Sequence, residues 1–136
     1  METVQTQKVF WWFSADLRIS HPALNPIEIS TLLDAVASIA MRPGESKVHH
    51  GDCRSAGYWV TVYRSEAPTR PDSGILWSER FVGERKALIS DLLEKGYSID
   101  VYIGIHSNVL ALGFNIPPTP ILWELGITLG IDYFSP

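Results

Sequence analysis

The C-terminal stretch from Tyr97 to Phe134 constrains the fold more than any other part of the chain. Residues 97–105 alternate, since the odd positions from Ile99 to Ile105 are apolar and the even positions are Ser, Asp, Tyr and Gly. Thr119 and Pro120 then open a short apolar helix, and Gly130 ends it before a last strand at 131–134. With a further strand at about 109–116, the order is strand, strand, helix, strand, which predicts a compact α+β domain.

The N-terminal part predicts a long strand followed by a capped helix. Residues 8–20 alternate, with an apolar run on both faces at 9–13 that suggests burial on both sides or a contact between molecules. Asn25, Pro26 and Glu28 have the residue types of a helix cap, a first helical position and a first turn. The apolar residues that follow recur at helical spacing and predict one inward face, made of Ile29, Leu32, Leu33 and Val36.

The middle of the chain predicts a second strand, a long helix and a hairpin. The strand covers 58–64, residues 67–73 form a loop, and Ser78 caps a helix that ends at Lys95 and Gly96. A fourth strand at about 109–116 pairs with 97–105. We therefore expect residues 1–136 to form one α+β domain, with 1–7 disordered. Its two layers are a mainly antiparallel sheet of about five strands and three helices on one face, in a ferredoxin-like βαββαβ order extended by an N-terminal βα unit.

Composition and charge narrow the classes of function. The 136 residues are 46% hydrophobic and carry a formal net charge of −4, from 15 acids and 11 bases. A non-specific nucleic-acid binder has the opposite balance, whereas an acidic chain suits a basic protein partner. A single cysteine, no signal-peptide pattern and no long apolar run predict a cytoplasmic protein with no membrane association.

One loop gathers several residue types that occur in catalytic and metal sites. His49, His50, Asp52 and Cys53 lie within five positions. Adjacent histidines on a loop supply one or two metal ligands at most, and a Cys–His pair also needs an orienting group and an oxyanion site. Because the sequence indicates neither, we favour a solvated loop and expect no cofactor, no metal and no enzymatic activity.

Three helices on one side of the sheet leave the other side open, and this inference carries the functional prediction. The outward positions predicted from strand parity are Asp16, Arg18, Trp59, Thr61, Tyr63, Ser98, Asp100 and Tyr102. Exposed aromatics can stack RNA bases, but the basic residues that flank such platforms are few here. We predict protein recognition instead, through Arg18, Asp52, Trp59, Tyr63, Asp100 and Tyr102.

The order of these motifs resembles the bacterial family called domain of unknown function 4279. The resemblance covers nearly the whole chain and rests on short motifs in sequence order: residues 15–19, 25–29, 51–52, 58–60, the long helix before Gly96, 125–127 and 131–133. The chain departs from the family pattern between Asp34 and Ser46. The family implies no established enzyme activity, and similar small acidic α+β proteins occur as immunity proteins beside bacterial toxins.

These observations leave three hypotheses. The first is a non-enzymatic protein-binding domain, of the immunity type in a bacterial toxin system, with a basic, toxin-like partner. The second is a small-molecule-binding or regulatory ferredoxin-like domain that acts as a homodimer through Phe10, Trp11 and Trp12. The third is an enzyme built on the loop from His49 to Cys53.

Overall fold

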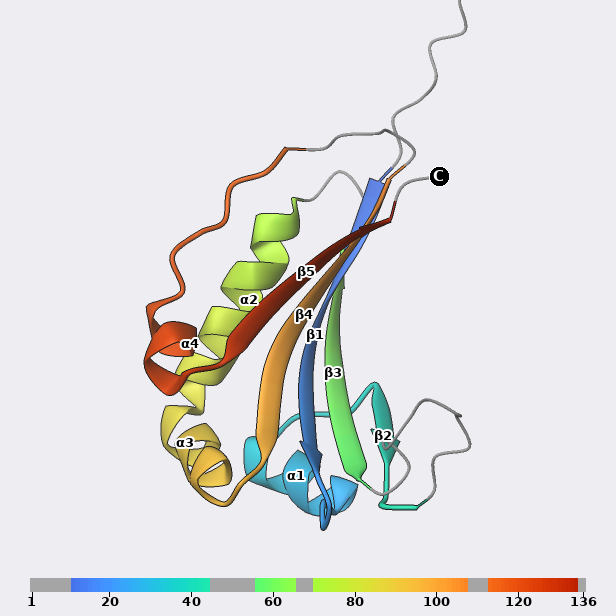
Figure 1. The fold of residues 1–136 in the computed structure, drawn as a ribbon, viewed down its shortest axis with the longest axis vertical. Coiled ribbons are helices and arrows are strands. Elements are labelled where there is room, and N and C mark those ends of the chain that lie inside the picture. The colour runs from blue at the N-terminus through green and yellow to red at the C-terminus, as the bar shows by residue number, and fades with distance from the viewer. Residues whose placement is uncertain (1–10, 45–55, 66–69, 108–112, 135–136) are drawn as a thin grey trace, which may run out of the picture.

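The chain folds into two layers, a five-stranded sheet with helices on one face (Figure 1). This computed structural model describes residues 11–44, 56–65, 70–107 and 113–134. The elements follow the order β1 (Trp11–His21), α1 (Pro26–Leu33), β2 (Ile39–Met41), β3 (Gly57–Ser65), α2 (Pro71–Glu84), α3 (Lys86–Glu94), β4 (Ser98–Ser107), α4 (Pro120–Leu125) and β5 (Thr128–Phe134). The α+β class and the arrangement of a sheet with helices on one face are confirmed. Four of the five predicted strands are found, and the described residues form four helices instead of three. The predicted ferredoxin-like βαββαβ order is wrong, because α4 connects β4 to β5 and residues 113–116 form no strand.

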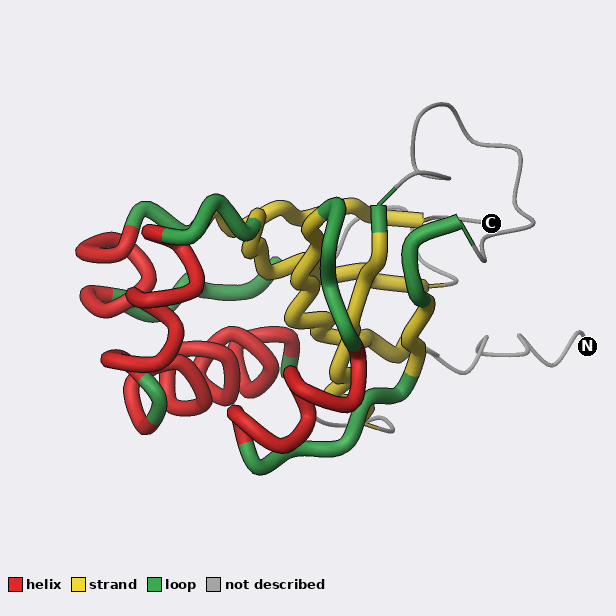
Figure 2. Tube along the Cα trace, turned by 90° about the horizontal axis from the view of Figure 1, so that it is seen from below, coloured by secondary structure: helices red, strands yellow, loops and turns green. Residues whose placement is uncertain are grey.

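The sheet is built around β1. Its strand order is β2-β3-β1-β4-β5, and β1 pairs antiparallel with both β3 and β4. The only parallel pair among the described strands is β4 with β5, whose connection passes through α4. Seen from below, the helices gather on one side of the strands and leave the other face uncovered by any described helix (Figure 2).

The core lies between the sheet and α2, which packs against β1, β3 and β4. Alternate side chains of β1 and β4 enter it and are almost fully buried: Phe13, Ala15, Leu17, Ile19, Ile99, Val101, Ile103 and Ile105. The register explains why both strands contribute the same face, since Ile19 lies opposite Ile99 and Leu17 opposite Val101. The alternation read from the sequence of these two strands is therefore confirmed.

Helix α1 begins where the Asn25 cap predicts, but it ends sooner than the apolar residues at helical spacing predict. The Asn25 side chain accepts a hydrogen bond from the Ile27 backbone N–H at 3.0 Å, which satisfies one free donor of the first turn. Asp34 then adopts a left-handed conformation with φ of 49°, and the helix stops. Ile29 and Leu33 are buried, but Leu32 and Val36 are exposed, so half of the predicted inward face is wrong.

The long helix predicted from Ser78 is two helices with an earlier start. Pro71 occupies the first position of α2, and Ser78 lies inside that helix with its hydroxyl donating to the Gly74 carbonyl. The break falls at Arg85, whose Nε donates to the Leu33 carbonyl at 2.6 Å and whose Nη1 donates to the Phe81 carbonyl. Arg85 thereby ties the end of α1 to the junction of α2 and α3.

The hairpin predicted after Ile105 does not appear in the described residues. Of the strand predicted at 109–116, residues 113–116 belong to no strand, and 109–112 lie outside the described residues, as do 1–7. The short strand β2, which the sequence did not predict, pairs with β3 instead. Gly126, and not Gly130, ends α4, so Gly130 lies within β5.

The predicted orientation of β3 is wrong. Trp59 and Thr61 lie opposite Ile19 and Leu17, whose side chains enter the core, so the odd positions of β3 point toward the helices. Trp59 is 0% exposed and its indole N–H donates to the Ser30 hydroxyl at 2.9 Å. Tyr63 stacks on Trp77 of α2 with ring centroids 5.6 Å apart. The valines at 60 and 62 occupy the opposite face.

We expect the contact between α2 and β1 to depend on a glycine. A Cβ added at Gly74 would lie 2.6 Å from Cε2 of Phe13 and 2.7 Å from Cβ of Ala15, both too close. Gly74→Ala should therefore destabilise the fold by about 1–3 kcal/mol, as measured by chemical denaturation. Gly83 in the same helix is the matched control, because its added Cβ would lie 3.5 Å from the nearest atom. Gly83→Ala should stabilise by roughly 0.5–1 kcal/mol, and equal losses at both positions would contradict this packing.

Candidate functional site

The uncovered face of the sheet, which we call the open face, is the candidate site. It carries the even-numbered positions of β1, β3, β4 and β5 together with Ile39 and Met41 of β2, because these lie opposite one another in the register. Alternation in β1 and β4 places mostly polar side chains here, between the apolar side chains that enter the core. The open face is therefore the polar side of the same alternation whose apolar side is covered by the helices.

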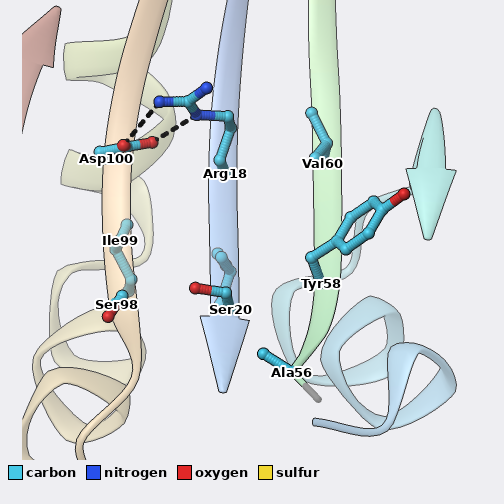
Figure 3. A pocket seen from close by; sticks show the side chains of 9 residues that line it. Arg18, Ser20, Ala56, Tyr58, Val60, Ser98, Ile99 and Asp100 are labelled. Carbon is cyan, nitrogen blue, oxygen red and sulfur yellow. Dashed lines mark hydrogen bonds and ion pairs between the residues drawn. The ribbon is translucent and has the colours of Figure 1, made fainter. Parts of the chain in front are cut away.

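A bidentate ion pair crosses the centre of the open face. Nε and Nη2 of Arg18 each donate to one carboxylate oxygen of Asp100, at 2.7 Å in both cases (Figure 3). The two residues are direct neighbours on β1 and β4, so the register alone brings them together. Their side chains are 46% and 39% exposed. The hydrogen bond to Asp100 is the main cause that raises the pKa of Arg18 above its ordinary value.

A tyrosine extends this pair into a network over three strands. The guanidinium carbon of Arg18 lies 4.9 Å from the centre of the Tyr102 ring, within the range of a cation–π contact. The Tyr102 hydroxyl donates to Oδ2 of Asp132 on β5 at 2.9 Å. Burial of the phenol, followed by this hydrogen bond, raises the pKa of Tyr102 above its ordinary value. The network fixes the orientation of the charged groups at the centre of the open face.

Three stacked rings lie at the end of the open face where β1 begins. His106 on β4 stacks between Trp12 on β1, at 4.0 Å between ring centroids, and Phe134 on β5, at 4.7 Å. The register places these residues side by side on the three strands. No role for His106 or Phe134 was predicted from the sequence, although His106 is the next even position of β4 after Gly104 and continues its alternation.

The other side of the open face is apolar. Ile39 of β2 is 52% exposed and lies opposite Val60 of β3, which is only 7% exposed, and Val62 follows on the same side of β3. Between this apolar side and the charged centre lies an open pocket of about 440 Å³, lined by Arg18, Ser20, Tyr58, Val60, Ser98 and Asp100 among others (Figure 3). The face therefore combines an apolar area, a hydrogen-bonded charged network and a concavity.

The structure brings together only some of the predicted site residues. Arg18, Asp100 and Tyr102 meet at the centre of the open face. Trp59 and Tyr63 lie on the helical side of the sheet, away from this face. The remaining predicted residue, Asp52, and the whole loop from His49 to Cys53 lie outside the described residues, as does Phe10. Trp11 lies in β1, and Trp12 is held by His106.

The described residues contain no group of three or more His, Cys, Asp or Glu side chains that could hold a metal ion. In the same part of the chain, no helix is long and apolar enough to span a membrane. Comparison of the chain with protein-family models, with curated proteins and with solved structures gave no match.

The central ion pair should contribute little to stability. Because both side chains are partly exposed, a double-mutant cycle with Arg18→Ala and Asp100→Ala should give a coupling of about 0.2–1 kcal/mol. The pair of Lys86 and Glu124 between α3 and α4 is the matched control, since it is also exposed and lacks the planar two-pronged donor. Its coupling should be smaller still. A coupling of several kcal/mol for Arg18 and Asp100 would mean that the open face is sealed from water.

Proposed function

We propose that the protein is a non-enzymatic domain that binds a basic protein partner through the open face of its sheet. The observation that carries this proposal is the uncovered face itself, with its apolar side, its charged network and its stacked rings on rigid strands. Protein interfaces combine an apolar area and aromatic anchors with polar groups of defined geometry. Rigid strands keep the groups that would meet the partner in place before it arrives.

Charge favours a basic partner. Three carboxylates, those of Asp16, Asp100 and Asp132, lie on the open face against the guanidinium of Arg18 among its described side chains. The whole chain carries a formal net charge of −4. Complementary charge speeds the encounter of two proteins and selects against acidic competitors. Nucleic acid is disfavoured by the same argument, since its phosphates would meet like charge.

The immunity-type role within a bacterial toxin system is part of the proposal. It rests on the resemblance to domain of unknown function 4279 and on the pairing of small acidic α+β proteins with toxins. A protein of this kind works by covering the partner's surface, which requires a broad, prearranged face and no catalytic group. The open face offers such a broad, prearranged surface on the strands where its side chains are described.

The experiment is co-purification from the native host, followed by affinity measurement with two charge reversals. A stoichiometric basic protein should be recovered, and Asp100→Lys on the open face, away from the sheet edges, should weaken its binding at least about tenfold. Glu94→Lys makes the same change in charge on an exposed position of α3 and should alter the affinity less than about twofold. Equal effects of both variants, or a protein that never forms a stoichiometric complex, would overturn the proposal.

The pocket supports a second candidate, a small-molecule-binding or regulatory domain. Its volume of about 440 Å³ is within the range of ligand sites, and Arg18, Asp100 and the serines at 20 and 98 offer polar contacts beside Val60. If this candidate is right, a metabolite will raise the melting temperature of the wild type. Ser98→Trp, an exposed change at the rim, should abolish that shift. A shift that persists in Ser98→Trp would place the ligand elsewhere.

A further inference from the structure

The two edges of the sheet differ in how they are protected against pairing with another strand. The edge strand β2 is three residues long, and short edges pair poorly. The edge strand β5 has seven residues, from Thr128 to Phe134, and contains no Lys, Arg or Pro. Its one charged side chain, Asp132, accepts a hydrogen bond from Tyr102 and is thereby directed onto the open face. Among the described strands only β4 pairs with β5, so its outer edge lacks a strand.

The sequence of β5 is complementary to itself in the antiparallel direction. About a two-fold axis at Ile131, Leu129 lies opposite Tyr133 of the second copy, so the side facing the helical layer pairs only apolar and aromatic residues. On the open side, Gly130 lies opposite Asp132 of the second copy. This register keeps the two Asp132 carboxylates from facing each other directly, which would otherwise oppose pairing.

A pocket beside β5 fits the aromatic side chain that this register delivers. The pocket has a volume of about 430 Å³ and is lined by Trp123, Thr128 and Leu129 among others. Trp123 on α4 is 86% exposed, the most exposed large hydrophobic side chain described. Because Leu129 faces Tyr133 of the second copy, that tyrosine would enter beside Trp123. The two-fold axis repeats the contact, so each copy both gives a tyrosine and receives one.

We propose that two copies of this chain pair along β5 in antiparallel fashion to form a ten-stranded sheet, with Tyr133 of each copy packed beside Trp123 of the other. The contact lies at the opposite edge from β2 and leaves both open faces uncovered on the same side of the joined sheet. The dimer is therefore independent of the partner-binding proposal, and its site differs from the start of β1 that the sequence suggested.

Sedimentation velocity over a range of concentrations tests the dimer. The wild type should sediment as a dimer. Tyr133→Lys should raise the dissociation constant of the dimer at least about tenfold, because the two-fold axis places the substituted residue in the interface twice. Trp123→Ala should act in the same direction. Val36→Lys is the matched control, since Val36 is 84% exposed and lies between α1 and β2, the strand at the other edge of the sheet from β5. A monomer at every concentration, or a dimer that resists Tyr133→Lys and Trp123→Ala, would overturn the proposal.

Disulfide trapping in a Cys53→Ser background tests the register. Ile131→Cys should cross-link to itself at the axis, where opposite residues are close enough for a disulfide. Thr128→Cys alone should not, because its two copies would be roughly 20 Å apart along the strands, but it should cross-link when mixed with Phe134→Cys. Thr128 and Phe134 are exposed, so this mixture gives a result even if Ile131→Cys folds poorly. Cross-linking of Thr128→Cys to itself would contradict the register.

Discussion

The structure depends on the strict alternation of β1, the central strand of the sheet. One set of its side chains, from Phe13 to Ile19 at odd positions, is sealed against α2, and this burial fixes its register with β3 and β4 on either side. A slip of one residue would put Arg18 into the core and Leu17 into water, so the register is strongly determined. The same constraint places Arg18 opposite Asp100 and Trp12 opposite His106. Core packing and the layout of the open face are therefore two results of one pairing.

The parts of the fold that are decided locally could be predicted from the sequence. The Asn25 cap depends on residues two positions apart, and the alternation of β4 is visible within ten residues. The orientation of β3 could not be predicted, because valines at 60 and 62 and aromatics at 59 and 63 alternate equally well. Tertiary contacts decide it: Ser30 of α1 accepts the Trp59 N–H, and Trp77 of α2 stacks on Tyr63. β2 and the break at Arg85 also depend on partners distant in the chain.

The candidate site was predictable to the same extent. Arg18, Asp100 and Tyr102 follow from the parity of β1 and β4, which was right. The wrong parity of β3 placed Trp59 and Tyr63 on the open face and hid the apolar positions there, Val60, Val62 and Ile39. The network to Asp132 and the ring stack on Phe134 were missed because they require the parallel pairing of β5, which no local pattern indicates. The face is consequently more apolar on one side and more ordered at its centre than the sequence suggests.

The central claim is that the open face is where a protein partner binds, and carboxyl-labelling mass spectrometry tests it most directly. In the free protein, the carboxylates of Asp100 on the open face and Glu94 on α3 should both react with a carbodiimide and an amine, because each has exposed surface. In the complex with the partner, Asp100 should become protected while Glu94 keeps its reactivity. Protection of Glu94 with Asp100 unchanged would place the partner on the helices and contradict the account.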